Sequence, residues 1–204
     1  MLTLYHCSQT RSTRILWLLE ELEIRQKVKV KLVSIQRSDG VGGIDPSNPH
    51  PEGKVPMLEH DGAYIRESTA IIQYLTDMFP DKGLGRNIGD RQRGAYLSWL
   101  SYYGGVMEPV LTVHFSSMKP DDMFRSSFRG YEEMADTLTA QLSKAPFLLG
   151  DDFSAADLLI SAPFIWFSAM APQTEPVQDW IVRCAERPAF SKVTSDDLGY
   201  LAQT

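Results

Sequence analysis

The chain has 204 residues, of which 43% are hydrophobic, and a formal net charge of −6 at pH 7. Its length suits one large domain or two small ones, and its apolar content excludes a disordered chain. The acidic balance argues against nucleic acid as the main partner, and no apolar run is long enough to cross a membrane.

The cysteines and histidines narrow the class of protein further. Cys7 and Cys184 lie far apart and lack metal-ligand spacing, which suits a reducing compartment better than a disulfide framework. The four histidines form no ligand-like pattern, so we expect no metal site. The N-terminus begins directly with a strand-like segment and has no charged leader, so we expect a cytoplasmic protein.

The first 50 or so residues mix strand-like and helix-like patterns. Residues 2–5 form a short apolar segment typical of a strand, and residues 12–22 carry a wide apolar helical face. Residues 27–33 alternate strictly between lysine and apolar side chains, which predicts an edge strand. Residues 34–52, with a turn signal at Asp39-Gly40, predict a loop with room for one helical turn.

The next segment carries the clearest functional signal. A short strand starts at Val55-Pro56, turns at Asp61-Gly62 and returns as a second strand, and a helix over residues 67–78 follows. Proline cannot donate to a sheet ladder, so Pro56 belongs at a strand's start or a special turn, where a cis peptide bond is tolerated. A cis bond would turn the Val55 backbone N–H and C=O outward, toward a peptide-like ligand.

The helix start at Glu67-Ser68 adds groups for the charged end of such a ligand. Free N–H groups and the positive end of the helix dipole suit a carboxylate, to which the Ser68 hydroxyl can donate. The Glu67 side chain can accept from an ammonium. These groups predict a pocket for a zwitterionic amino-acid end, although an ordinary strand–turn–strand–helix unit explains the same residues equally well from local physics.

Strand patterns stop after a Pro- and Gly-rich linker at residues 79–85. We expect one long helix over residues 91–115, kinked at Pro109, and a second helix over residues 123–142. We expect the last helix over residues 176–186, followed by Arg187-Pro188-Ala189.

A capping box precedes a further helix in this half of the chain. The Ser154 hydroxyl can accept from the backbone of Asp157, and the Asp157 side chain can reach back to Ser154, with Phe153 placed as the hydrophobic staple. The apolar helix that follows runs to about Met170. This motif favours folding and carries no function by itself.

Two motifs resemble those of a known family. Gly53-Lys54-Val55-Pro56-Met57-Leu58 and the run from Glu67 to Leu75 resemble the glutathione-binding signature of the cytosolic glutathione transferase superfamily. The capping box and the Arg187-Pro188-Ala189 ending resemble that family's helical domain. The resemblance implies an α/β plus all-α protein: a thioredoxin-like domain over residues 1–79, a linker over residues 80–88 and a helical-bundle domain over residues 89–204.

Three stretches resemble the yeast-type branch of this superfamily, which occurs in fungi and bacteria. They are the segments 11–22, 50–54 and 99–109. The branch usually has a glutamate where this chain has Gly104, and this departure affects the shape of the second-substrate pocket.

The resemblance also implies roles for individual residues. Glutathione would be the co-substrate, with Lys54 toward its glycyl carboxylate, Val55 and Pro56 along its backbone, and Glu67 and Ser68 at its γ-glutamyl end. A small hydrophobic electrophile would occupy a pocket with Tyr102, Tyr103 and Met107, although such residues at helical spacing equally fit an ordinary core. The family further implies a homodimer.

The loop before the first helix is where the thiol of glutathione would be activated. Residues 6–12 are polar, and a free thiol with a pKa of about 8.5 needs a hydroxyl donor, a helix N-terminus or a cation to become a thiolate near neutral pH. The yeast-type register places that family's serine at Thr10, and the omega-type register places that family's cysteine at Cys7. Ser8 offers another hydroxyl, and all three residues also suit a helix cap or a small buried position.

These residues leave three functions open. The first is a glutathione transferase that joins the glutathione thiolate to small hydrophobic electrophiles. The second is a Cys7-dependent glutathione thiol transferase or reductase, which would form a mixed disulfide. The third is a non-catalytic module that keeps the fold and binds a protein partner.

Overall fold

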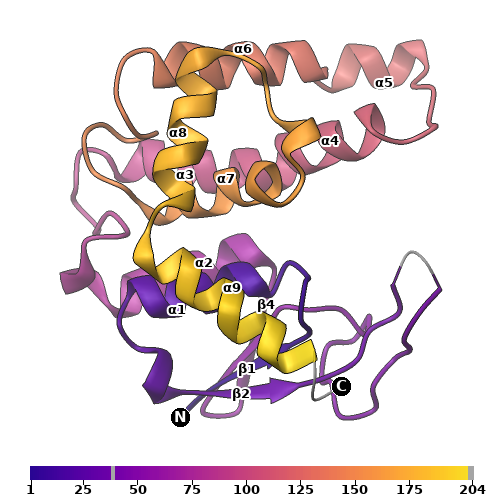
Figure 1. Cartoon of the computed structure of the whole chain (residues 1–204), viewed down its shortest axis with the longest axis vertical. Coiled ribbons are helices and arrows are strands. Elements are labelled where there is room, and N and C mark those ends of the chain that lie inside the picture. Colours follow the sequence, from indigo (N-terminus) through magenta and orange to yellow (C-terminus); the bar gives the residue numbers. More distant parts are fainter. Residues whose placement is uncertain (38–39, 202–204) are drawn as a thin grey trace. The chain divides into compact units, whose positions relative to one another are not determined.

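The computed structural model describes residues 1–37 and 40–201 (Figure 1). Two compact units form: Met1–Lys82 with the C-terminal segment from Arg187, and Gly83–Glu186. The first unit holds a thioredoxin-like sheet with helices and the second is helical, so the predicted α/β plus all-α fold is confirmed. The predicted domain limits place the segment from Arg187 in the helical domain, whereas its contacts group it with the first unit.

A four-stranded sheet in the order β2-β1-β3-β4 forms the centre of the first unit. β1 runs parallel to β2 and antiparallel to β3, and β4 returns antiparallel to β3. The edge position predicted for residues 27–33 is therefore confirmed. The strands are β1 (Leu2–His6), β2 (Val28–Leu32), β3 (Met57–His60) and β4 (Ala63–Arg66).

The predicted hairpin turn joins β3 to β4. Asp61 and Gly62 have φ angles of 49° and 86°, the left-handed pair that a two-residue hairpin loop requires. Residues 34–37 and 40–52 contain no helix or strand, which agrees with the predicted loop, whereas Asp39 lies outside the described residues. At the first strand, β1 is one residue longer than predicted, because His6 belongs to the strand and not to the loop that follows.

Three helices belong to this unit: α1 (Thr13–Glu21), α2 (Ser68–Met78) and α9 (Pro188–Leu201). They lie on one side of the sheet, and α1 packs against both α2 and α9 (Figure 1). The apolar face predicted for residues 12–22 is buried, because this side of α1 fills the core between sheet and helices. Short 3₁₀ turns span Arg25–Lys27 and Pro80–Lys82.

The prediction that the chain's last helix ends near residue 186 is wrong. α8 (Glu175–Ala185) ends there, but α9 begins at Pro188. Proline is tolerated in the first turn of a helix because the N–H that it lacks would have no intrahelical partner. The start of α9 is fixed by Arg187, whose Nε and Nη2 donate to the Glu21 carboxylate at 2.7 and 2.6 Å.

The second unit is all helical. Among its described helices, none combines the length and the apolar character needed to cross a membrane. Its elements are α3 (Arg93–Tyr102), a π-helical turn (Tyr103–Met107), α4 (Glu108–His114), α5 (Asp122–Ser127), α6 (Tyr131–Leu142), α7 (Ala155–Trp166), a 3₁₀ turn (Ser168–Met170) and α8.

Two predicted helices of this unit need correction. The single helix over residues 123–142 is wrong, since Phe128 is extended and Gly130 starts a new helix, its N–H donating to the Glu133 carboxylate at 2.7 Å. The helical run over residues 91–115 is interrupted by the π turn, which directly precedes the first turn of α4. Pro109 sits in that first turn, where its missing N–H is tolerated.

The predicted capping motif is present at the start of α7. The Asp157 carboxylate accepts from the Ser154 backbone N–H at 2.9 Å and from the Ser154 hydroxyl at 2.7 Å. It also accepts from the backbone of Leu148 and from the Trp180 indole, at 2.8 and 2.9 Å. Asp157 therefore ties together the helix start, the preceding turn and α8. The helix itself ends at Trp166, earlier than predicted.

Candidate active site

The strand register brings the predicted site residues to one end of the sheet. Tyr5 at the end of β1 faces Met57 at the start of β3, which faces Arg66 at the end of β4. The segments that continue from these positions are the loop from Cys7, the Val55-Pro56 corner and the Glu67-Ser68 helix start. Topology alone therefore places them side by side within the first unit.

The Val55-Pro56 corner has the geometry expected of a peptide-binding edge. Its peptide bond is cis, one of the two forms that the sequence left open at this corner. Both side chains are buried, and Val55 packs in an apolar cluster with Tyr5, Val33 and Met57. Within the described part of the chain, the Val55 backbone N–H and C=O make no hydrogen bond. They are available for a ligand backbone in the way that an open strand edge is.

Glu67 stands at the start of α2 with an unusual backbone. Its φ of 68° and ψ of 125° lie outside the favoured regions for a residue with a side chain. Its side chain is exposed and makes no capping hydrogen bond to α2, and Ser68 is half-buried beside it. Strained backbone of this kind clusters at ligand sites, and the open helix start suits an anionic group.

Lys54 is exposed on the loop that leads into the corner. Its backbone C=O accepts from the buried Asn48 side chain at 3.0 Å, and the Gly53 N–H donates to the His50 C=O at 2.9 Å. Gly53 has a φ of 62°, and a Cβ there would lie 3.2 Å from the Ile44 side chain. These contacts hold the backbone of the loop in place, while the Lys54 side chain is exposed to solvent.

The three catalytic candidates lie in different environments at the end of β1. The Thr10 hydroxyl is half-buried and donates to the Cys7 C=O at 2.6 Å, with the Ser12 Oγ at 2.8 Å. The Ser8 Oγ is buried and has no hydrogen-bond partner among the described residues. Cys7 is half-buried, and its thiol packs against the apolar cluster around Val55.

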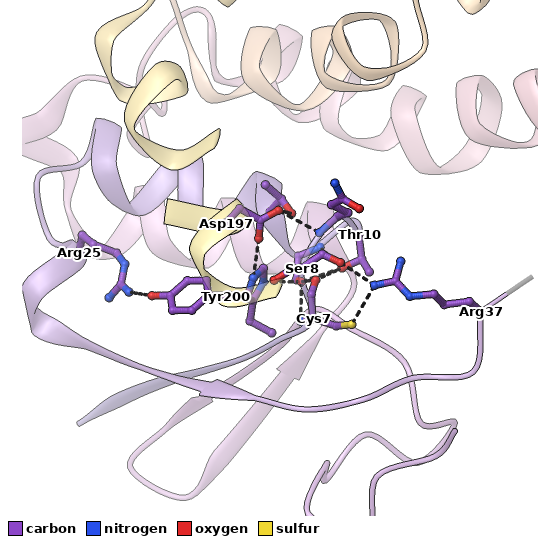
Figure 2. Close-up of polar contacts among 11 residues, drawn as sticks. Cys7, Ser8, Thr10, Arg25, Arg37, Asp197 and Tyr200 are labelled. Atoms are coloured by element: carbon purple, nitrogen blue, oxygen red, sulfur yellow. Dashed lines mark hydrogen bonds and ion pairs between the residues drawn. The ribbon is translucent and has the colours of Figure 1, made fainter. Parts of the chain in front are cut away.

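Arg37 supplies the cation of this loop, and the sequence pattern gave no sign of it. From the segment after β2, its Nη2 donates to the Ser8 C=O at 2.8 Å and lies 3.5 Å from the Cys7 Sγ (Figure 2). Arg11, the cation closest in sequence, is exposed. A guanidinium at this distance favours a negatively charged sulfur near it.

Asp197 of α9 is a second group that sequence reasoning missed. It accepts hydrogen bonds from His6, from the Gln9 backbone N–H and from the Thr13 hydroxyl. Burial raises the pKa of Asp197, but these three donors outweigh burial and hold the pKa below its ordinary value. Asp197 lies in the helix that was not predicted, and His6 was assigned to the polar loop 6–12, so no sequence signal pointed to this contact.

The residues predicted for a second-substrate pocket are unevenly accessible. Tyr103 and Met107 are buried in the helical unit, and the Tyr103 hydroxyl donates to Glu108 at 3.0 Å. Tyr102 is half-buried. Of these three predicted residues, Tyr102 is the one with a partly exposed side chain that a ligand could contact. Among the residues described, no cluster of His, Cys, Asp and Glu side chains is suited to hold a metal.

Known proteins resemble this chain over both units. A profile for the glutathione S-transferase N-terminal domain matches residues 4–83, and one for the C-terminal domain matches residues 125–192. The chain is 31% identical over 175 residues to glutathione S-transferase PM239X14 of Arabidopsis thaliana, covering 76% of this chain and 74% of the relative. Glutathione S-transferase 3 of Schizosaccharomyces pombe is 24% identical over 93% of this chain and 85% of its own length.

Solved structures share the fold. A ternary complex of BphK, a bacterial GST, superposes with a TM-score of 0.74 at 24% identity, covering 96% of this chain and 98% of that one. Because of the two profile matches and the Arabidopsis relative, the chain belongs to the glutathione S-transferase family.

Proposed function

We propose that this enzyme conjugates the thiolate of glutathione to small hydrophobic electrophiles, and that it belongs to the yeast-type branch. The observation that carries the proposal is the gathering of the open Val55 backbone, the strained Glu67 and the loop from Cys7 at one end of the sheet. The branch assignment rests on the segments 11–22, 50–54 and 99–109.

In this account glutathione lies along the Val55-Pro56 corner as an added strand. The Val55 N–H and C=O pair with its cysteinyl backbone. The start of α2 and the Ser68 hydroxyl donate to the γ-glutamyl carboxylate, while Glu67 accepts from the ammonium. Lys54 attracts the glycyl carboxylate. Each group of the tripeptide then has a complement among the predicted residues.

The thiol is directed toward the loop between β1 and α1. The Thr10 hydroxyl turns from the Cys7 C=O to donate to the sulfur, and the Arg37 guanidinium adds positive charge. Each unit by which the thiol pKa falls corresponds to about 1.4 kcal/mol of preferential thiolate stabilisation. The thiolate then attacks the electrophilic carbon, forming a C–S bond while the leaving group departs with its electron pair.

One observation favours a second function. Cys7 is half-buried at the end of β1, and the Arg37 Nη2 lies 3.5 Å from its sulfur, so a disulfide held at this loop would meet a thiol with a cation beside it. In that case Cys7 would displace a thiol from a glutathione mixed disulfide. We further propose that the protein is a cytoplasmic homodimer. Tyr102, whose side chain is half-buried, is the candidate residue of the helical unit for binding the electrophile.

Calorimetric titration with reduced glutathione tests the binding site. Wild type is expected to bind, and Glu67→Gln and Ser68→Ala are each expected to weaken binding by about 10-fold, as expected for loss of a charge-assisted hydrogen bond. Glu132→Gln, which removes the same charge from an exposed position of α6, serves as the control and should bind like wild type. Equal affinities for Glu67→Gln, Ser68→Ala and wild type would refute the assignment, and no binding by wild type would leave the protein-binding module as the better account.

A further inference from the structure

A buried chain of hydrogen bonds connects α9 to the candidate catalytic loop. Asp197 Oδ1 lies 2.7 Å from His6 Nε2, and His6 Nδ1 lies 2.7 Å from the Ser12 Oγ. The Ser12 Oγ lies 2.8 Å from the Thr10 hydroxyl. These residues are drawn in Figure 2, where Asp197 and Arg37 approach the loop from different sides.

The other oxygen of Asp197 binds the same loop directly. Asp197 Oδ2 accepts from the Gln9 backbone N–H at 2.9 Å and from the Thr13 hydroxyl at 3.1 Å. Gln9 has a φ of 55°, a left-handed conformation that costs a residue with a side chain about 1 kcal/mol or more. The bond to Asp197 holds this conformation, and Gln9 directly precedes Thr10.

This series of hydrogen bonds resembles the Asp–His–Ser triad of a hydrolase, but its burial excludes Ser12 as a nucleophile. His6 and Ser12 are 0% exposed and Asp197 is 4% exposed, so no substrate reaches the Ser12 oxygen. A carboxylate only accepts, so His6 presents Nε2–H to Asp197 and turns Nδ1 toward Ser12. These contacts hold each group in place up to the Thr10 hydroxyl, which is the first half-exposed member.

Two further residues lie next to the His6–Asp197 contact. Tyr200 belongs to α9, as Asp197 does, and Arg25 belongs to the 3₁₀ turn before β2. The Tyr200 ring stands edge-on to His6 at 5.6 Å between ring centres. Its hydroxyl lies 2.5 Å from the Arg25 guanidinium. The last turns of α9 are thus held at a second point, and Asp197 approaches the loop on a rigid support.

We propose that Asp197 is a positioning residue for catalysis: it holds residues 6–13 so that their hydroxyl donor meets the sulfur of bound glutathione. This inference rests on the proposed glutathione transfer. It places the effect on thiolate formation and turnover, because the groups assigned to the rest of glutathione lie on the loop before β3 and at the start of α2. It holds whether the Ser8 or the Thr10 hydroxyl faces the sulfur.

The test compares Asp197→Ala with a matched control, Glu21→Gln. Glu21 also ties α9 to α1, through Arg187, but touches no residue of the loop. Three quantities are measured well below each variant's melting temperature: kcat with an activated aryl chloride, affinity for S-methylglutathione, and the ultraviolet absorbance of the bound thiolate against pH.

Asp197→Ala is expected to lower kcat by about 10-fold to 100-fold, the usual effect of losing a supporting hydrogen bond behind a catalytic group. The bound thiol should titrate at higher pH, while affinity for S-methylglutathione stays within about 2-fold. Asp197→Asn keeps one oxygen acceptor for the Gln9 N–H and should fall between Asp197→Ala and wild type. If Asp197→Ala does not fold, Asp197→Asn carries the comparison.

Two results overturn the inference while leaving the proposed function intact. In one, Asp197→Ala loses no more turnover than Glu21→Gln and its bound thiol titrates as in wild type. In the other, affinity for S-methylglutathione falls as much as kcat, which marks a general structural role. A wild-type protein that neither binds glutathione nor forms product would instead refute the function from which the inference starts.

Discussion

At the scale of single residues, the account depends on what the Thr10 hydroxyl does. In the structure its proton is directed to the Cys7 C=O at 2.6 Å, and its oxygen accepts from the Ser12 backbone N–H at 3.2 Å. A sulfur placed at the Val55-Pro56 corner would compete for that proton. A neutral loop carbonyl is the weaker acceptor, so the hydroxyl is expected to turn toward the thiolate.

Thr10→Val removes this donor while keeping the side-chain shape. We expect kcat to fall by about 100-fold, the usual cost of losing one donor to a developing anion, with the affinity for S-methylglutathione nearly unchanged. Thr112→Val is the control, because the Thr112 hydroxyl only donates to the Glu108 C=O within α4. A Thr10→Val enzyme with wild-type turnover, alongside an inactive Cys7→Ser enzyme, would shift catalysis to Cys7.

At the scale of elements, the predictions that the structure confirms rest on local sequence signals that allow only one secondary structure. The alternation of residues 27–33, the Asp61-Gly62 turn and the Ser154–Asp157 cap are local signals with one structural outcome, and the structure has all three. α9 escaped prediction because Pro188 equally marks a helix's end and its first turn. The positioning role of Asp197 was consequently invisible, since it arises from contacts 184 to 191 residues apart.

The buried cap at α7 yields a stability prediction. Asp157→Ala leaves four donors without their acceptor, two backbone N–H groups, the Ser154 hydroxyl and the Trp180 indole. We expect the free energy of unfolding to drop by about 3–5 kcal/mol, as for other buried, charged hydrogen-bond centres. Asp121→Ala, at the exposed N-cap of α5, should cost about 1 kcal/mol in the same denaturant titration. Equal costs for the two variants would mean that Asp157 acts only as a local cap.

At the scale of the whole molecule, the candidate site is built from both ends of the sequence. The loop before β3 and the start of α2 carry the predicted glutathione contacts, and α9 returns after the helical unit to support the loop between β1 and α1. The placement of residues 54–56 and 67–68 at one end of the sheet could be predicted because a short motif carries them. Arg37 could not, because its role depends on where a loop of irregular backbone folds back.

The most direct measurement is mass spectrometry of wild-type protein and products after incubation with glutathione and an activated aryl chloride. The account predicts a glutathione–aryl thioether formed far faster than without protein, with Cys7 left unmodified. Absence of the thioether would contradict it. So would a Cys7–glutathione disulfide as the main protein species in a parallel incubation to which glutathione disulfide is added, where Cys7 displaces one glutathione thiol from it.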